Sequence, residues 1–127
     1  MSLRILVADD DPLMRTLVAV CLQDIAEIRQ AGDGAETVSM LEQAGVDLLL
    51  LDWDMPALDG LAVLKMVRSR GFLMPVIMVT AEADSLQVLK ALDAGATDYL
   101  IKPFESMVLR EKVKRLCKLI HMEPVNP

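Results

Sequence analysis

Short apolar runs alternate along the chain with longer stretches in which apolar residues recur every three or four positions. A short run that ends abruptly at a polar residue suits a strand buried on both faces, as in a parallel sheet. The longer stretches have the period of amphipathic helices. The run of four leucines from Leu48 to Leu51 stands at the middle of this pattern. The pattern predicts five strands, over residues 4–8, 27–31, 48–51, 76–79 and 99–101. The second is short and polar, which predicts an edge strand.

Five helices are expected to follow these strands. The first begins at Pro12, directly after an aspartate that can cap it, because proline suits the first helical position. The others are expected over about 35–43, about 61–69, from Asp84 or Ser85 to Gly95, and from about Met107 onward. Their apolar stripes are Met14, Leu17, Val18, Cys21, Leu22 and Ile25 on the first helix, Val38 and Leu41 on the second, Leu86, Leu89 and Leu92 on the fourth, and Leu109, Val113, Leu116 and Ile120 on the fifth.

The strict alternation of strand and helix predicts an α/β fold, a doubly wound parallel sheet of five strands with five helices. A chain of 127 residues is long enough for one domain with a sizeable core. We expect that domain over residues 1–120. Residues 121–127 carry two prolines and are expected to be a C-terminal tail or the start of a linker.

Composition narrows the classes of function. The chain is 54 % hydrophobic, but its apolar runs are strand-sized, so no membrane span is expected. The net charge of −6 argues against direct nucleic-acid binding by this domain. Without a secretory signal we expect a cytoplasmic location, where Cys21 and Cys117 stay reduced and fill the core. His121 is the single histidine, which argues against a histidine triad or a multi-histidine metal site.

Polar side chains follow four of the expected strands at their carboxyl ends. Asp9 and Asp10 follow the first, Asp52 the third, Thr80 the fourth and Lys102 the fifth. In a parallel sheet these positions lie along one edge, where open α/β sheets bind their ligands. Each residue also has an ordinary interpretation: the aspartates as helix caps, Thr80 as the end of a strand and Lys102 as a surface charge. The combination favours a shared site.

The chemistry of such a site follows from its charges. Three clustered carboxylates repel one another unless a proton or a cation lies between them. A hard divalent ion with oxygen ligands fits, Mg²⁺ first and Mn²⁺ as an alternative. An ammonium and a hydroxyl beside that ion form a cradle for a phosphoryl group. Asp52 is then the candidate nucleophile, which would form an aspartyl phosphate.

Four stretches carry a resemblance to a known family: ADD at 8–10, LLLLDWDMPALDG around Asp52, VTAEA at 79–83 and DYLIKPF at 98–104. They closely resemble response-regulator receiver domains, those of the single-domain chemotaxis regulators most of all. The likeness covers residues 3–119. It implies a flavodoxin-like sheet with the strand order 2-1-3-4-5.

The resemblance also implies roles for individual residues. Asp9, Asp10 and Asp52 would hold Mg²⁺ together with the backbone carbonyl of Asp54. Thr80 and Lys102 would bind the phosphoryl oxygens.

The same resemblance implies a signalling cycle. Asp52 would accept phosphate from a sensor histidine kinase or phosphotransfer protein. Thr80 and Tyr99 would form the switch that a downstream effector protein or a fused output domain detects. The chain would then be no enzyme beyond its own phosphorylation and dephosphorylation, and Lys102–Pro103 is expected to be cis. Asp54 is acidic where the chemotaxis relatives have an amide, which adds charge at the mouth of the site.

Two other classes remain as alternatives. An apolar strand ending in Asp52 and Asp54 also resembles haloacid-dehalogenase-like phosphatases, in which the first aspartate is the nucleophile and the second the acid. Those enzymes usually have a longer chain and a further acidic pair downstream, whereas here the pair lies upstream. A flavodoxin-like electron carrier would share the sheet, but it needs a hydroxyl- and glycine-rich phosphate loop where this chain has DDDPLMR.

Overall fold

The structure, a computed structural model, describes residues 3–43, 45–82 and 84–119. Within these ranges the chain alternates strictly between strand and helix. The strands are β1 (Leu3–Ala8), β2 (Ala26–Ala31), β3 (Leu48–Asp52), β4 (Val76–Thr80) and β5 (Asp98–Ile101). The helices are α1 (Pro12–Leu22), α2 (Gly34–Gln43), α3 (Gly60–Ser69), α4 (Ser85–Asp93) and α5 (Ser106–Leu119). The predicted tail, His121 and Ile120 lie outside the described residues.

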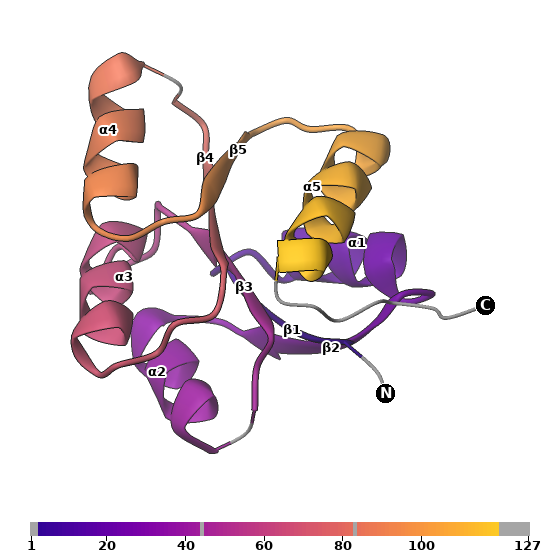
Figure 1. The fold of residues 1–127 in the computed structure, drawn as a ribbon, viewed down its shortest axis with the longest axis horizontal. Coiled ribbons are helices and arrows are strands. Elements are labelled where there is room, and N and C mark those ends of the chain that lie inside the picture. Colours follow the sequence, from indigo (N-terminus) through magenta and orange to yellow (C-terminus); the bar gives the residue numbers. More distant parts are fainter. Residues whose placement is uncertain (1–2, 44, 83, 120–127) are drawn as a thin grey trace.

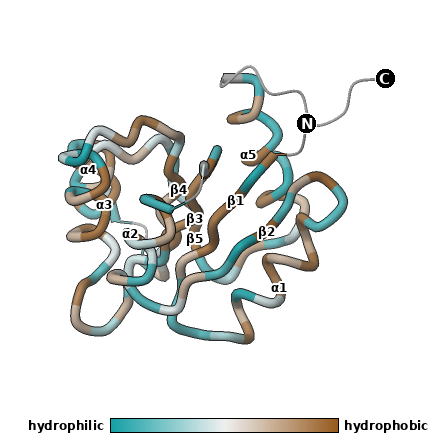
Figure 2. The backbone as a smooth tube through the Cα atoms, turned by 90° about the horizontal axis from the view of Figure 1, so that it is seen from below, coloured by the Kyte–Doolittle hydropathy of each residue, from teal (hydrophilic) through white to brown (hydrophobic). Residues whose placement is uncertain are grey.

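The strands form one parallel sheet in the order β2-β1-β3-β4-β5, as predicted. Helices α1 and α5 cover one face, and α2, α3 and α4 cover the other (Figure 1). The leucine run forms the central strand because both faces of β3 are covered, and all five of its residues are buried. Polar β2 lies at the edge, as its sequence predicts, and Figure 2 shows mixed colours along it beside the brown of the inner strands.

Successive residues of β3 point to opposite faces of the sheet and so enter two separate core clusters. Leu50 packs with residues of α1 and α5, such as Val18 and Leu109. Leu49 and Leu51 pack with residues of α2 and α3, and with Ala91 of α4. Cys117 is buried and Cys21 is half-buried against the first cluster, as expected of core residues.

The apolar stripe of α4 faces solvent and not the core. Leu86, Leu89 and Leu92 are 63 %, 61 % and 45 % exposed, and the buried residue of α4 is Ala91. A small alanine lets the helix lie close to the sheet, whereas leucines on that face would hold it away. Leu17, on the stripe of α1, is likewise 51 % exposed, and Ile25 lies beyond the end of that helix at Leu22.

Candidate functional site

Backbone hydrogen bonds just beyond the strands fix the predicted residues along one edge of the sheet. The Asp9 N–H donates to the Ala31 carbonyl, so β1 and β2 stay paired up to the first aspartate. Farther along the same edge, the Trp53 N–H donates to the Val79 carbonyl at 2.8 Å, and the Lys102 N–H donates to the Thr80 carbonyl at 2.8 Å. The ends of β3, β4 and β5 are therefore held in register where the polar side chains begin.

Asp9, Asp10 and Asp52 come together as the sequence predicts. One carboxylate oxygen of each residue lies within 4.8 Å of those of the other two. Asp9 and Asp52 are each only 3 % exposed, whereas Asp10 is exposed. Two buried carboxylates and one open to solvent form a pocket of oxygen ligands with one side accessible.

Lys102 enters this cluster from the end of β5. Its Nζ lies 3.0 Å from Asp52 Oδ1 and 3.3 Å from Asp9 Oδ2. Burial pulls the pKa of Lys102 down, but Asp52 and Asp9 together outweigh that effect and raise the pKa. The ammonium therefore stays charged and offsets part of the negative charge of the cluster. The Lys102–Pro103 peptide is cis, as predicted.

Lys102 offsets the negative charge of Asp52 only in part. Burial raises the pKa of Asp52 to about 6; Lys102 opposes the rise, and the charges of Asp9 and Asp54 add to it. Asp52 Oδ1 is buried and accepts no hydrogen bond, because Lys102 approaches it as an ion pair without hydrogen-bond geometry. A buried carboxylate that is costly to ionise and lies beside two other carboxylates fits a hard divalent cation.

The neighbours of this cluster have separate tasks. Asp11 caps α1: its side chain accepts from the Leu13 N–H at 2.9 Å, so it lies outside the cluster although it is the third consecutive aspartate.

Arg15 was not among the predicted residues. Its Nη1 donates to the Asp9 carbonyl at 2.6 Å and its Nε to Gln30 at 3.1 Å. Arginine one helical turn after an aspartate cap was the available signal for a residue that holds the Asp9 backbone.

Gly60 is a second residue that sequence reasoning missed. It starts α3, its N–H donates to the Trp53 carbonyl at 2.7 Å, and a β-carbon on it would overlap the Asp52 carbonyl oxygen and lie 2.7 Å from Trp53 Cα. Only glycine lets α3 begin this close to the backbone of Asp52. The pair Asp59-Gly60 looked like an ordinary turn because nothing local reveals that approach.

Thr80 and Tyr99 lie on neighbouring strands. Thr80 is 5 % exposed, and its hydroxyl accepts from the Glu82 N–H at 3.1 Å. Tyr99 is half-buried and pairs with Met78 in the β4–β5 register, two residues before Thr80. Its ring packs against the core cluster that contains Ala91. The two predicted switch residues are thus near each other in the sheet.

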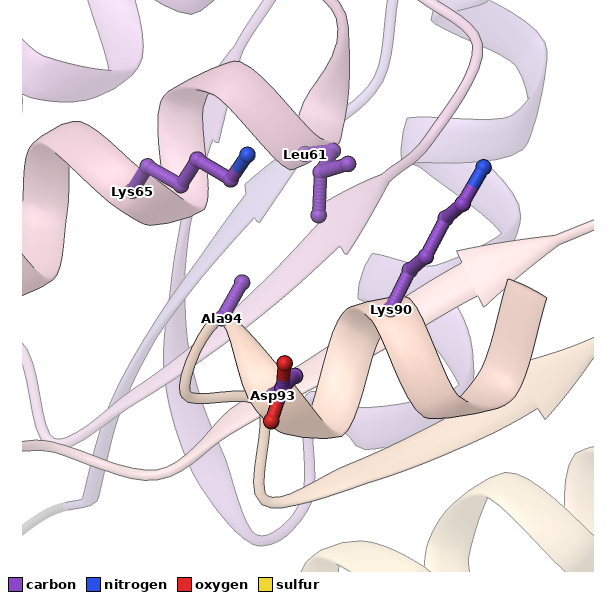
Figure 3. A pocket seen from close by; sticks show the side chains of 5 residues that line it. All are labelled: Leu61, Lys65, Lys90, Asp93 and Ala94. Carbon is purple, nitrogen blue, oxygen red and sulfur yellow. The ribbon is translucent and has the colours of Figure 1, made fainter. Parts of the chain in front are cut away.

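A shallow hollow of about 390 Å³ lies between α3 and α4 (Figure 3). It is lined by Leu61, Lys65, Lys90, Asp93 and Ala94. None of these residues belongs to the acidic cluster, and the lysines and the aspartate are exposed. The chemistry predicted from the sequence is therefore centred on the strand ends and not on this hollow.

Comparison with known proteins identifies the class of this fold and site. Residues 5–114 match the response regulator receiver domain family, and the chain belongs to that family. It is the receiver domain of a two-component response regulator, a signalling domain.

Particular relatives are chemotaxis regulators. The chain is 36 % identical over 123 residues to the chemotaxis protein CheY of Pseudomonas aeruginosa. The aligned residues cover 94 % of this chain and 99 % of the relative. It is 35 % identical over 119 residues to chemotaxis protein CheY-3 of Vibrio cholerae, with 91 % and 92 % covered. Among solved structures, the receiver domain of the Francisella response regulator 1452 superposes with a TM-score of 0.89 at 31 % identity, over 94 % of this chain and 99 % of that chain.

These comparisons bear on the principal alternative and on the partners of the chain. A haloacid-dehalogenase-like phosphatase is not supported. Membership of the family implies a histidine kinase or phosphotransfer partner and a downstream effector. No helix in the described part of the chain is long and apolar enough to cross a membrane.

Proposed function

We propose that Asp52 is the phosphoacceptor of this receiver domain. The observation that carries the proposal is the position of its carboxylate: buried at the end of the central strand, within 4.8 Å of two other carboxylates and 3.0 Å from an ammonium. A buried nucleophile with both a cation site and a fixed positive charge beside it suits phosphoryl transfer, which depends mainly on positioning and charge stabilisation.

The proposed step moves one phosphoryl group. An Asp52 carboxylate oxygen attacks the phosphorus of a phosphohistidine on the sensor kinase or phosphotransfer protein. The new P–O bond forms as the P–N bond breaks, and the electron pair leaves with the imidazole. Lys102 and Thr80 bind the phosphoryl oxygens, the first by charge and the second through its hydroxyl.

We propose Mg²⁺ as the cofactor, with Mn²⁺ able to replace it. Asp9, Asp10 and Asp52 would hold the ion, and the backbone carbonyl of Asp54 would complete the protein ligands. When bound, the ion neutralises charge on the carboxylates and on the phosphoryl group. The raised pKa of Asp52 and the two carboxylates beside it support this assignment, because a divalent cation would offset a negative charge that burial makes costly.

The proposed readout passes through Thr80 and Tyr99. A phosphoryl group on Asp52 draws the Thr80 hydroxyl from the Glu82 N–H toward itself, which frees space next to β5 for Tyr99. The surface around β5 then changes for an effector protein or a fused output domain.

The remaining assignments complete this proposal. Residues 1–120 form the receiver and 121–127 a tail or the start of a linker. The domain works in the cytoplasm, without binding nucleic acid itself, and catalyses only its own phosphorylation and dephosphorylation.

One experiment tests the assignment of the acceptor. A small acyl phosphate with Mg²⁺ should add about 80 Da, the mass of one phosphoryl group, to the intact protein and place it on Asp52. Asp52→Asn should abolish the added mass, while Asp54→Asn should retain it. Mass that persists in the first variant, at another residue, would refute the proposal.

A further inference from the structure

The ring of Tyr99 has a cation on its face. Lys112, on α5, places its Nζ 5.5 Å from the centroid of the ring, within the range of a cation–π contact. Tyr99 and Lys112 both border a hollow of about 380 Å³ between β5 and α5, so each has room to move away from the other. The position of the ring therefore depends on what keeps the lysine in place.

Asp98 keeps it in place. The Lys112 Nζ donates to both carboxylate oxygens of Asp98, at 3.2 and 3.1 Å. The two side chains are only 21 % and 18 % exposed, so this pair is screened less than an open surface pair. Asp98 Oδ1 also accepts the N–H of Tyr99 itself at 2.8 Å. One carboxylate thus holds both the backbone of Tyr99 and the cation above its ring.

We propose that Asp98 is a positioning residue for Tyr99 and acts through Lys112. By fixing the ammonium over the ring it stabilises the half-buried position of Tyr99 and sets how readily the ring leaves it. This proposal rests on the proposed function only in so far as movement of Tyr99 is the readout of phosphorylation. A cation–π contact at a site of this exposure is worth roughly a two- to five-fold change in the ratio of two ring positions.

Arg115 provides the matched control. Its Nη2 lies 2.9 Å from Asp98 Oδ2, so it forms an ion pair with the same carboxylate. It is 65 % exposed, and the cation placed over the ring of Tyr99 is that of Lys112. Loss of Arg115 removes one cationic partner of Asp98 and leaves the Lys112 ammonium over the ring.

The resting protein gives the first test. Tyr99 is the only tyrosine, so its ring signals in an NMR spectrum are unambiguous. In wild type the terminal methylene protons of Lys112 should be shifted upfield by the ring. Asp98→Asn keeps an acceptor for the Tyr99 N–H but not the charge, and should remove that shift and move the Tyr99 signals. Lys112→Met should move the Tyr99 signals in the same way, Lys112→Arg should restore them, and Arg115→Gln should leave them unchanged.

A double variant separates action through Lys112 from independent effects. Asp98→Asn combined with Lys112→Met should move the Tyr99 signals no further than either change alone. Additive movement, an unchanged Lys112 shift in Asp98→Asn, or an equal effect of Arg115→Gln would each overturn the proposal.

The phosphorylated protein gives the second test. With the acyl phosphate donor, Asp98→Asn should raise the ratio of displaced to resting Tyr99 roughly two- to five-fold over wild type. The added mass on Asp52 should be the same in both proteins. Equal mass with an equal ratio would refute the role of Asp98 and leave the phosphoacceptor intact. If wild type gains no mass, the proposed function fails, and the resting-state comparison still decides the role of Asp98.

Discussion

Lys102 Nζ lies 3.0 Å from Asp52 Oδ1 although the two residues end strands that are not neighbours, because β4 lies between β3 and β5. The same ammonium lies 3.3 Å from Asp9, at the end of β1 on the far side of β3. One long side chain thus spans the carboxyl edge of four adjacent strands. The balance of charge in the site depends on this reach.

Removing that charge should make Asp52 harder to ionise. Lys102 lowers a pKa that burial has raised to about 6, so Lys102→Met should move the pKa of Asp52 above that value in metal-free protein. Methionine keeps most of the apolar stem and loses the ammonium. Carboxyl carbon NMR across a pH titration measures the change. Lys102→Arg, which keeps a charge, should leave the pKa closer to that of wild type, and a lower pKa in Lys102→Met would contradict the assigned electrostatics.

The buried charge of Asp52 should also appear in the pH dependence of stability. The folded state binds the Asp52 proton more tightly than the unfolded chain does, since the pKa rises from about 3.9 to about 6 on folding. Between these values the unfolded chain holds fewer protons, so stability falls as the pH rises through this window. Without divalent cations, Asp52→Asn should therefore be more stable than wild type by about 1–3 kcal/mol at pH 7.

Denaturant unfolding at several pH values measures that difference. The gain should level off near its minimum at about pH 3, below both pKa values, where the carboxyl group is largely protonated in both states. Exposed Asp54 is the control, and Asp54→Asn should change the free energy of unfolding by less than about 0.5 kcal/mol. A gain for Asp52→Asn that does not depend on pH would show that the buried charge is not its cause.

Metal affinity should depend on the carboxylate cluster and not on the acidic run as such. Asp10→Asn should weaken Mg²⁺ binding by about tenfold or more, because the ion loses a charged ligand from a small set. Asp11→Asn is the matched control: asparagine is also a good helix cap, and Asp11 lies outside the cluster. Fluorescence of Trp53, the only tryptophan and the neighbour of Asp52, can report the titration. Equal loss in both variants would indicate a general effect of charge.

Gly60→Ala should damage both stability and the site. The new methyl group overlaps the Asp52 backbone, which cannot yield as the end of a flexible side chain can, so we expect a loss of about 2–4 kcal/mol. Gly32→Ala is the control, because the nearest atom to its added carbon is Arg15 Nη1 at 3.4 Å, the end of a flexible side chain. Thermal unfolding compares the two, and amide signals of Trp53 show whether the strand end has moved. Equal losses of stability in the two variants would show that overlap with the Asp52 backbone is not the cause of the effect at Gly60.

The sequence by itself determined the features that depend on local periodicity and on residue type. Four of the five strands are apolar runs that end at a polar residue. The pair Asp11 and Pro12 indicates the start of α1. Once the strands are parallel, their carboxyl ends share an edge, so Asp9, Asp52 and Lys102 had to come near one another. For the same reason the polar strand β2 was expected at the edge of the sheet, where the structure places it.

Only the tertiary structure decided what depends on distance and burial. The pattern of α4 shows an apolar stripe, but the packing of Ala91 against the sheet turned that stripe outward. The raised pKa of Asp52 comes from removal of water by residues far away in the chain. The contact between Lys112 and Tyr99 joins a helix to a strand through the carboxylate of Asp98. Periodicity gives the order of residues along one element, whereas desolvation and close approach are set by which elements pack together and how closely.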